Sequence, residues 1–166
     1  MIKKKVCMLG AFAVGKTSLV QQFVNSIFSE KYHTTIGVKI DQKMVQVQEK
    51  SVNLLLWDIH GEDNFQKVKA SYLTGASGYF IVVDGTRRDT IKVGLDLKAM
   101  ADTIVKGAFF LMLINKLDLR EEEWEITERD IRNLEELGIE VILTSAKENV
   151  GVEEAFLRLT ELMINQ

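Results

Sequence analysis

The chain has 166 residues, which suits one compact domain, and its 46% apolar and 27% charged residues are typical of a globular protein. The formal net charge of −3 excludes a basic nucleic-acid footprint, and its one cysteine, Cys7, which we expect in the core, excludes an internal disulfide. The sequence shows no apolar run near the about 20 residues that a membrane span needs.

The first half of the chain is predicted to form a strand, a helix and a β-hairpin. A short apolar run at 6–9 predicts a buried strand, and apolar residues recur at helical spacing over 19–27. A β-rich stretch at 36–47, a polar turn at 48–50 and a second strand at 52–57 predict an antiparallel hairpin.

The second half alternates apolar strands with amphipathic helices. Strands are expected at 79–83, 109–114 and 140–143, and helices over 93–104, 127–138 and 152–163. Thr127 and Asp130 fit a capping box, and Gly138 fits the C-terminal cap of the same helix. This pattern predicts an α/β fold with a mostly parallel sheet and helices on both faces. Ligands bind beyond the carboxyl ends of such strands.

A phosphate-binding loop follows the first strand. Residues 10–17, Gly-Ala-Phe-Ala-Val-Gly-Lys-Thr, match G-x-x-x-x-G-K-[ST] between a predicted strand and a predicted helix, which is the context the motif requires. Successive N–H groups and the helix N-terminus attract phosphate, and Lys16 adds a point charge for the β- and γ-phosphates. The Thr17 hydroxyl suits Mg²⁺. The loop alone does not identify the base.

The base is indicated by Asn115-Lys116-Leu117-Asp118 at the end of the third apolar strand. A carboxylate accepts two hydrogen bonds at once, and guanine presents N1–H and its N2 amino group side by side, whereas adenine does not. Asp118 therefore predicts guanine selectivity. Asn115 can bridge to the base or steady neighbouring loops, and the aliphatic stem of Lys116 can cover the base face.

Three weaker motifs gain weight from their positions at strand ends or in loops. Asp58-Ile59-His60-Gly61 follows the hairpin, where the carboxylate can hold Mg²⁺ and Gly61 lets a backbone N–H approach the γ-phosphate. Thr34 or Thr35 can complete the metal shell. Backbone N–H groups of residues 144–147, Thr-Ser-Ala-Lys, can meet guanine O6.

The order and spacing of these five elements resemble the Ras-like small GTPases, and the Rab branch most closely, over essentially the whole chain. The resemblance implies a single P-loop NTPase G domain over 1–166, with a six-stranded, mostly parallel sheet, one antiparallel strand and five helices. It implies GTP or GDP with Mg²⁺, held by Thr17, Thr35 and Asp58. It also implies a cycle in which GTP orders two switch segments, of which switch I matches residues 32–38 and switch II begins at residues 57–62.

The resemblance also carries site residues onto this chain. The implied catalytic residues are Lys16, Gly61 and Glu62. The implied GTP-binding residues are Ala11, Ala13, Val14, Gly15, Lys16, Thr17, Ser18, Phe28, Tyr32, Thr35, Asp58, Gly61, Asn115, Lys116, Asp118, Ser145, Ala146 and Lys147.

Protein partners are implied as well. Effector, exchange and activating proteins would bind the switch regions, and Ile40, Trp57 and Tyr72 match an effector-binding triad. Core packing explains Trp57 equally well and is favoured for Ile40. With neither a signal peptide nor a lipid-attachment motif in the sequence, we expect a cytoplasmic monomer, or a protein peripheral to a membrane if a C-terminal tail has been removed.

Two departures from the family pattern bear on catalysis. The water-positioning Gln is replaced by Glu62, which as a carboxylate can only accept hydrogen bonds, so we expect slow intrinsic hydrolysis. Phe12 replaces a small residue beside the γ-phosphate, where it would obstruct an activator's arginine finger, unless it folds away over the switch II helix. His60 stands where the family has Ala; a hydrogen-bonded surface histidine is favoured over a pH sensor.

The function that these residues indicate is a GTP-binding switch that hydrolyses GTP slowly and engages effectors in the GTP state. Two alternatives remain at this point. One is a non-catalytic module with a structural nucleotide, and the other is the G domain of a larger multidomain protein.

Overall fold

Six strands form one sheet in the computed structural model, which describes residues 1–30, 35–63 and 67–165. The strands are β1 (Ile2–Gly10), β2 (Val38–Val47), β3 (Lys50–Ile59), β4 (Gly78–Asp84), β5 (Phe109–Asn115) and β6 (Val141–Leu143). The helices are α1 (Lys16–Asn25), α2 (Asp89–Ile104), α3 (Arg120–Glu123), α4 (Glu128–Glu136) and α5 (Val152–Ile164). Single 3₁₀ turns, η1 and η2, occupy Ala70–Tyr72 and Leu117–Leu119.

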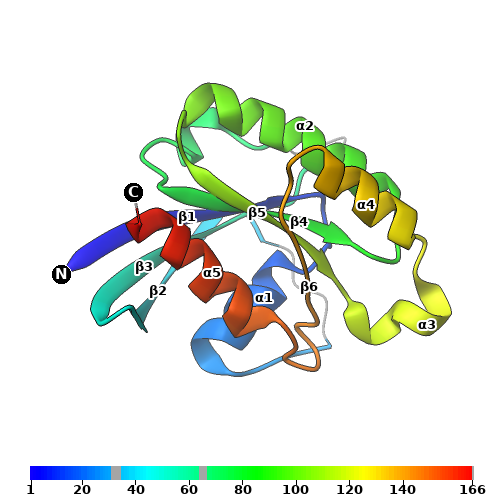
Figure 1. Cartoon of the computed structure of the whole chain (residues 1–166), viewed down its shortest axis with the longest axis horizontal. Helices are drawn as coiled ribbons and strands as arrows, with labels where there is room; N and C mark the ends of the chain where they lie inside the picture. Colours follow the sequence, from blue (N-terminus) through cyan, green and yellow to red (C-terminus); the bar gives the residue numbers. More distant parts are fainter. Residues whose placement is uncertain (31–34, 64–66, 166) are drawn as a thin grey trace.

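The strand order is β2-β3-β1-β4-β5-β6, and only β2 runs antiparallel to its neighbour (Figure 1). The β2–β3 hairpin closes through Gln48 and Glu49, whose φ angles of 50° and 63° fit the two-residue turn that matches strand twist. The predicted fold class and hairpin are confirmed. Strands β1, β3, β4 and β5 extend beyond the ranges predicted for them, because backbone pairing continues past the buried side chains, whereas β2 begins two residues and β6 one residue later than predicted.

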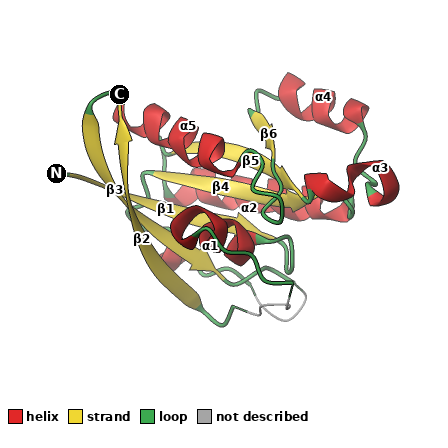
Figure 2. Ribbon diagram, turned by 90° about the horizontal axis from the view of Figure 1, so that it is seen from below, coloured by secondary structure: helices red, strands yellow, loops and turns green. Residues whose placement is uncertain are grey.

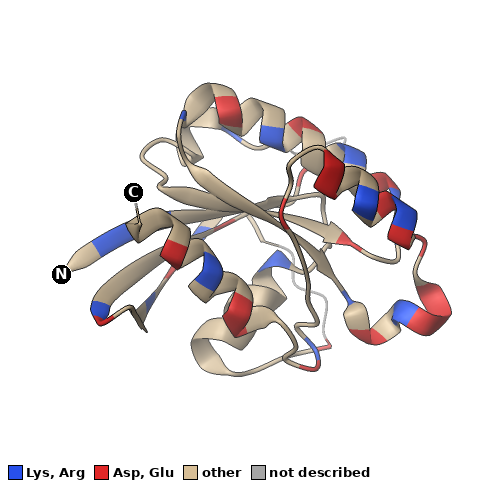
Figure 3. Cartoon of the chain, viewed as in Figure 1, with Lys and Arg blue, Asp and Glu red and all other residues tan. Residues whose placement is uncertain are grey.

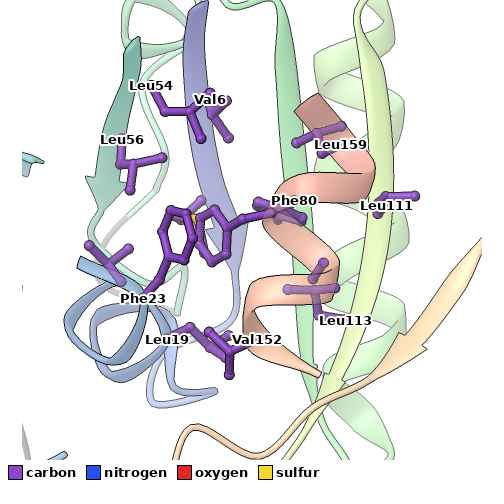
Figure 4. Packing of buried hydrophobic residues seen from close by; sticks show 14 of the residues in the cluster. Val6, Leu19, Phe23, Leu54, Leu56, Phe80, Leu111, Leu113, Val152 and Leu159 are labelled. Carbon is purple, nitrogen blue, oxygen red and sulfur yellow. The ribbon is translucent and has the colours of Figure 1, made fainter. Parts of the chain in front are cut away.

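Helices cover both faces of the sheet. Helices α1 and α5 lie on one face, and α2 and α4 lie on the other (Figures 1 and 2). Under α1 and α5, the Phe23 and Phe156 rings stack with centroids 4.0 Å apart, and Phe80 from β4 meets Phe156 edge-on. Figure 4 shows Phe23 and Phe80 in this core. Cys7 is fully buried in the second apolar cluster, on the other face, as expected.

The caps of α4 agree with the sequence. Thr127 and Asp130 form the reciprocal capping box. Gly138 follows the last turn at φ 82°, and the N–H groups of Gly138 and Ile139 bond to the carbonyls of Glu135 and Leu134, as in a Schellman motif.

Surface charges of both signs alternate along α2 and α4 (Figure 3). The acidic residues 121–123 are exposed and belong to the single helical turn α3, which η2 leads into directly. Among the described residues, no helix is both long and apolar enough to cross a membrane.

The carboxyl ends of four neighbouring strands meet at one edge of the sheet. Strand β1 ends at Gly10, β3 at Ile59, β4 at Asp84 and β5 at Asn115, and the last two residues are paired across β4 and β5. The loops that leave these ends carry the motifs singled out in the sequence.

Candidate functional site

The loop between β1 and α1 is held by side chains that bond its carbonyl oxygens. The Lys16 Nζ lies 3.3 Å and 3.0 Å from the oxygens of Gly10 and Ala11, Arg87 donates to Phe12 O (2.7 Å), Lys116 to Ala13 O (3.3 Å) and Asn115 to Val14 O (3.1 Å). These donors engage carbonyl oxygens that would otherwise repel an anion in the loop. Gly15 is the N-cap of α1 at φ 104°, and a Cβ there would collide with the Asn115 amide.

Lys16 is the buried cation of this loop, with 5% of its surface exposed. Burial lowers the pKa of its ammonium from 10.5 to about 8; nearby Asp58 acts in the opposite direction, and Arg87 lowers it further. A buried ammonium group bonded to carbonyl oxygens gains strongly from an anionic ligand. The loop is therefore built to receive a phosphate group.

The residues of the N-K-x-D motif are oriented by the segment that follows β6. Ser145 Oγ donates to Asp118 Oδ1 at 2.8 Å. Asn115 Oδ1 accepts from Thr144 Oγ1 at 3.1 Å and from the Ala146 N–H at 3.3 Å. The Asp118 carboxylate and the Asn115 amide are thus both fixed at the carboxyl edge of the sheet. The Ala146 N–H, expected to face guanine O6, bonds to Asn115 in this structure.

One cavity of about 470 Å³ joins the loop to the N-K-x-D motif, a size suited to a small ligand. Its lining includes most of the predicted site: Ala13, Gly15, Lys16, Thr17, Ser18, Phe28, Thr35, Gly61, Asn115, Lys116, Asp118, Ala146 and Lys147. Phe12, Ser29, Glu30 and Leu119 complete it. An ion pair between Lys147 and Glu30 (3.2 Å) joins two of its walls.

Five predicted residues do not line the cavity: Ala11, Val14, Asp58, Glu62 and Ser145. Each is hydrogen-bonded to a lining residue, as Ser145 is to Asp118. Tyr32 and Thr34 fall outside the described residues.

Three oxygen-bearing side chains meet beside Lys16. Thr17 Oγ1 lies 2.7 Å from Thr35 Oγ1 and 2.7 Å from Asp58 Oδ2. Burial raises the pKa of Asp58, against the effects of Thr17 and Lys16. Its Oδ1 atom is buried without a hydrogen-bond partner in the described parts of the chain. Hard oxygen donors with one unsatisfied carboxylate atom fit Mg²⁺, and the structure brings together the three residues predicted for it.

The segment after β3 is attached to the phosphate-binding loop by its backbone. Phe12 N–H donates to Glu62 O (3.0 Å), and Glu62 N–H donates to Gly10 O (3.1 Å). A Cβ on Gly61 would collide with the Phe12 backbone, so only glycine permits this approach.

His60 departs from the expectation of a surface histidine, because only 6% of its surface is exposed. Its Nδ1 lies 3.1 Å from Gly37 O and its Nε2 lies 2.9 Å from Lys67 O. The ring therefore connects the segment that follows Thr35 to the segment that follows residue 66.

The three residues matched to an effector triad have different environments. Ile40 is 50% exposed, which contradicts the expected core packing, because β2 is the edge strand of the sheet. Trp57 is half-buried with Lys5 Nζ 3.5 Å from its ring centroid, and Tyr72 packs partly buried against the second cluster.

Sequence reasoning missed Asp84, Arg87 and Trp124. Asp84 is fully buried at the end of β4 and binds Lys116 (2.7 Å) and Arg87 (3.1 Å). Trp124 Nε1 donates to Lys116 O at 2.8 Å, and its ring fills the space where Gly85 lacks a side chain. The available signal was an acidic residue that ends a wholly apolar strand next to Asn115.

Comparisons with known proteins agree with this geometry. The family model described as "Ras family" matches residues 5–165. The chain is 29% identical to Ras-related protein Rab-3C from Mus musculus over 98% of the chain and 72% of that relative. It is also 29% identical to Ras-related protein Rab-3B from Homo sapiens, over 98% of the chain and 74% of that protein.

Proposed function

The chain belongs to the Ras family, and on that basis we propose that the cavity between the phosphate-binding loop and Asp118 is its nucleotide site. The chain is a Rab-like GTP-binding switch protein with GTPase activity. We take residues 1–166 as a single G domain. The observation that carries the assignment is that Lys16 and the Ser145-held Asp118 line one cavity.

Each end of the cavity has a role in this proposal. Lys16 and the loop N–H groups hold the β- and γ-phosphates. Asp118 accepts the two guanine donors, with Ser145 fixing one of its oxygens, and Phe28 stacks against the base. A base without two adjacent donors would leave the carboxylate unpaired, which costs affinity.

Mg²⁺ is proposed to be held by Thr17, Thr35 and Asp58. When bound, such an ion neutralises phosphate charge in the family reaction. Asp58 Oδ1 supports the proposal because it is buried and without a partner among the described residues. Nucleotide release after chelation with EDTA tests this directly: release that is unchanged by EDTA would contradict it, and Asp58→Asn is expected to reduce the EDTA effect.

Hydrolysis is proposed to be slow because of Glu62. A carboxylate can accept from the attacking water but cannot donate to a phosphoryl oxygen, and its charge opposes the γ-phosphate. Glu62→Gln restores both capacities and is expected to raise the single-turnover rate about tenfold, a contribution of modest size for water positioning.

The matched control is Glu121→Gln, which makes the same chemical change at an exposed residue of α3. Its rate should equal that of the wild type. A wild-type enzyme as fast as Glu62→Gln would refute the role of Glu62. GTP that stays intact for many hours in both proteins would favour a non-catalytic module.

Phe12 is proposed to limit activation by other proteins. It lines the cavity next to Ala13, and an arginine finger that enters there raises the rate of GTP hydrolysis by roughly 10³–10⁵-fold. An arginine-finger activator should stimulate Phe12→Gly far more than the wild type. Equal, large stimulation of both proteins would show that the ring leaves the path open.

Effectors, exchange factors and activators are proposed to bind around the two switch segments. The supporting feature is a set of exposed apolar residues just before and along β2: Ile36 (85%), Ile40 (50%) and Met44 (45%). GTP-dependent binding of a partner that is lost in Ile40→Asp would test it.

A further inference from the structure

Asp84 is a buried carboxylate with a complete set of hydrogen-bond donors. Its Oδ1 accepts from the Thr86 N–H (2.8 Å) and the Thr86 hydroxyl (2.7 Å). Its Oδ2 faces the Lys116 ammonium at 2.7 Å and the Arg87 Nε at 3.1 Å. Burial acts to raise the pKa of Asp84, but Lys116 and Thr86 outweigh it and hold the pKa below the ordinary value of an Asp carboxyl group. The carboxylate is thus a fixed anion at the end of β4.

Both cations that Asp84 holds extend to the phosphate-binding loop. Arg87 uses Nε for Asp84 and its terminal amino group for Phe12 O at 2.7 Å. Lys116 reaches Ala13 O at 3.3 Å. A single carboxylate therefore fixes two donors on consecutive carbonyls of the loop.

We propose that Asp84 and Arg87 are positioning residues that set the loop backbone at Phe12 and Ala13 and thereby slow nucleotide release. Neither side chain lines the cavity, so the effect acts through the loop. Arg87 can bond two groups at once because a guanidinium presents donors in a planar fork, whereas a lysine ammonium is a single point. This distinguishes positioning from a simple contribution of positive charge.

The test compares two neighbouring arginines. Arg87→Lys keeps the charge but loses the fork, and we expect GDP dissociation about tenfold faster, the lower range for one charge-assisted hydrogen bond. Arg88→Lys is the matched control, since Arg88 contacts Asp130 through two nitrogens (3.1 Å and 2.6 Å) at the surface and contacts no described residue of the loop. Its dissociation rate should match that of the wild type.

A second readout separates positioning from general destabilisation. Because Phe12 and Ala13 belong to the phosphate-binding loop, Arg87→Lys should weaken the binding of GDP more than the binding of GMP. The ratio of GDP affinity to GMP affinity should therefore fall. A structural defect would weaken both nucleotides equally. Asp84→Asn should give the same pattern, provided circular dichroism shows that it folds, and Arg87→Gln serves in its place if it does not.

The inference is refuted if Arg87→Lys releases GDP within about twofold of the wild type, or if Arg88→Lys changes the rate equally. It is also refuted if GDP and GMP affinities fall by the same factor. The inference rests on the proposed nucleotide site, whose failure looks different: the wild type itself would then show no preference for GDP over ADP.

Discussion

Replacing Asp118 by Asn should change which base the protein prefers. The substitution keeps the size of the side chain but turns one acceptor into a donor. Guanine presents two donors, so one hydrogen bond would be lost and two donors would face each other. Xanthine has a carbonyl oxygen where guanine has the amino group, and it therefore matches the amide.

The size of the expected loss in GTP affinity follows from the two hydrogen bonds between Asp118 and guanine. Each bond to a charged group contributes about 1.5–3 kcal/mol, and the variant loses one and weakens the other, about 3–4 kcal/mol together. GTP affinity should fall by about two to three orders of magnitude, since 1.4 kcal/mol is a factor of about ten. Xanthosine triphosphate should recover most of the loss.

Displacement of a fluorescent GDP analogue by GTP, xanthosine triphosphate and ATP measures these affinities. Ser145→Ala is the control, because it removes the 2.8 Å bond that orients Asp118 but leaves the carboxylate. We expect a loss of about tenfold for GTP with no gain for xanthosine triphosphate. Asp118→Asn that keeps GTP affinity within tenfold, or gains nothing for xanthosine triphosphate, would remove Asp118 from the base site.

Three further outcomes follow from the geometry around the loop. In nucleotide-free protein, the free energy of unfolding should rise between pH 8 and 10.5, because the folded state releases the Lys16 proton at a lower pH than the unfolded chain does. Chemical denaturation at several pH values measures this rise, and Lys16→Met should abolish it. Gly61→Ala should slow single-turnover hydrolysis by up to about 100-fold, since the added methyl must displace the segment from Phe12, while GDP binding persists. His60→Ala should lower the free energy of unfolding by about 2 kcal/mol and the melting temperature by about 6 °C, measured by calorimetry; no change would mean that its two bonds contribute little.

The elements that the sequence predicted correctly depend on local chemistry. The α4 capping box needs only Thr127 and Asp130, three residues apart, and the hairpin needs only a two-residue turn between two strands. The sheet follows because apolar runs of this length must be covered on both faces. The phosphate-binding loop carries its own motif and its own context.

The incorrect expectations concern contacts between distant segments. His60 is buried because residues 37 and 67 both come to it, which no local pattern reveals. Ile40 is exposed because β2 lies at the sheet edge, a fact of strand order rather than of composition. The contact between Arg87 and Phe12 spans 75 residues of the chain, so it becomes visible only when β1 and β4 are paired.

The position of Trp124 provides a spectroscopic probe that needs no label. The chain has two tryptophans, and the Nε1 of Trp124 bonds to the backbone of Lys116, inside the motif proposed to read the base. The other, Trp57, lies in β3 beneath the Lys5 ammonium. Trp57→Phe would leave a single emitter whose indole N–H senses the base loop, so that loading and release of unmodified nucleotide could be followed by emission wavelength and intensity in real time.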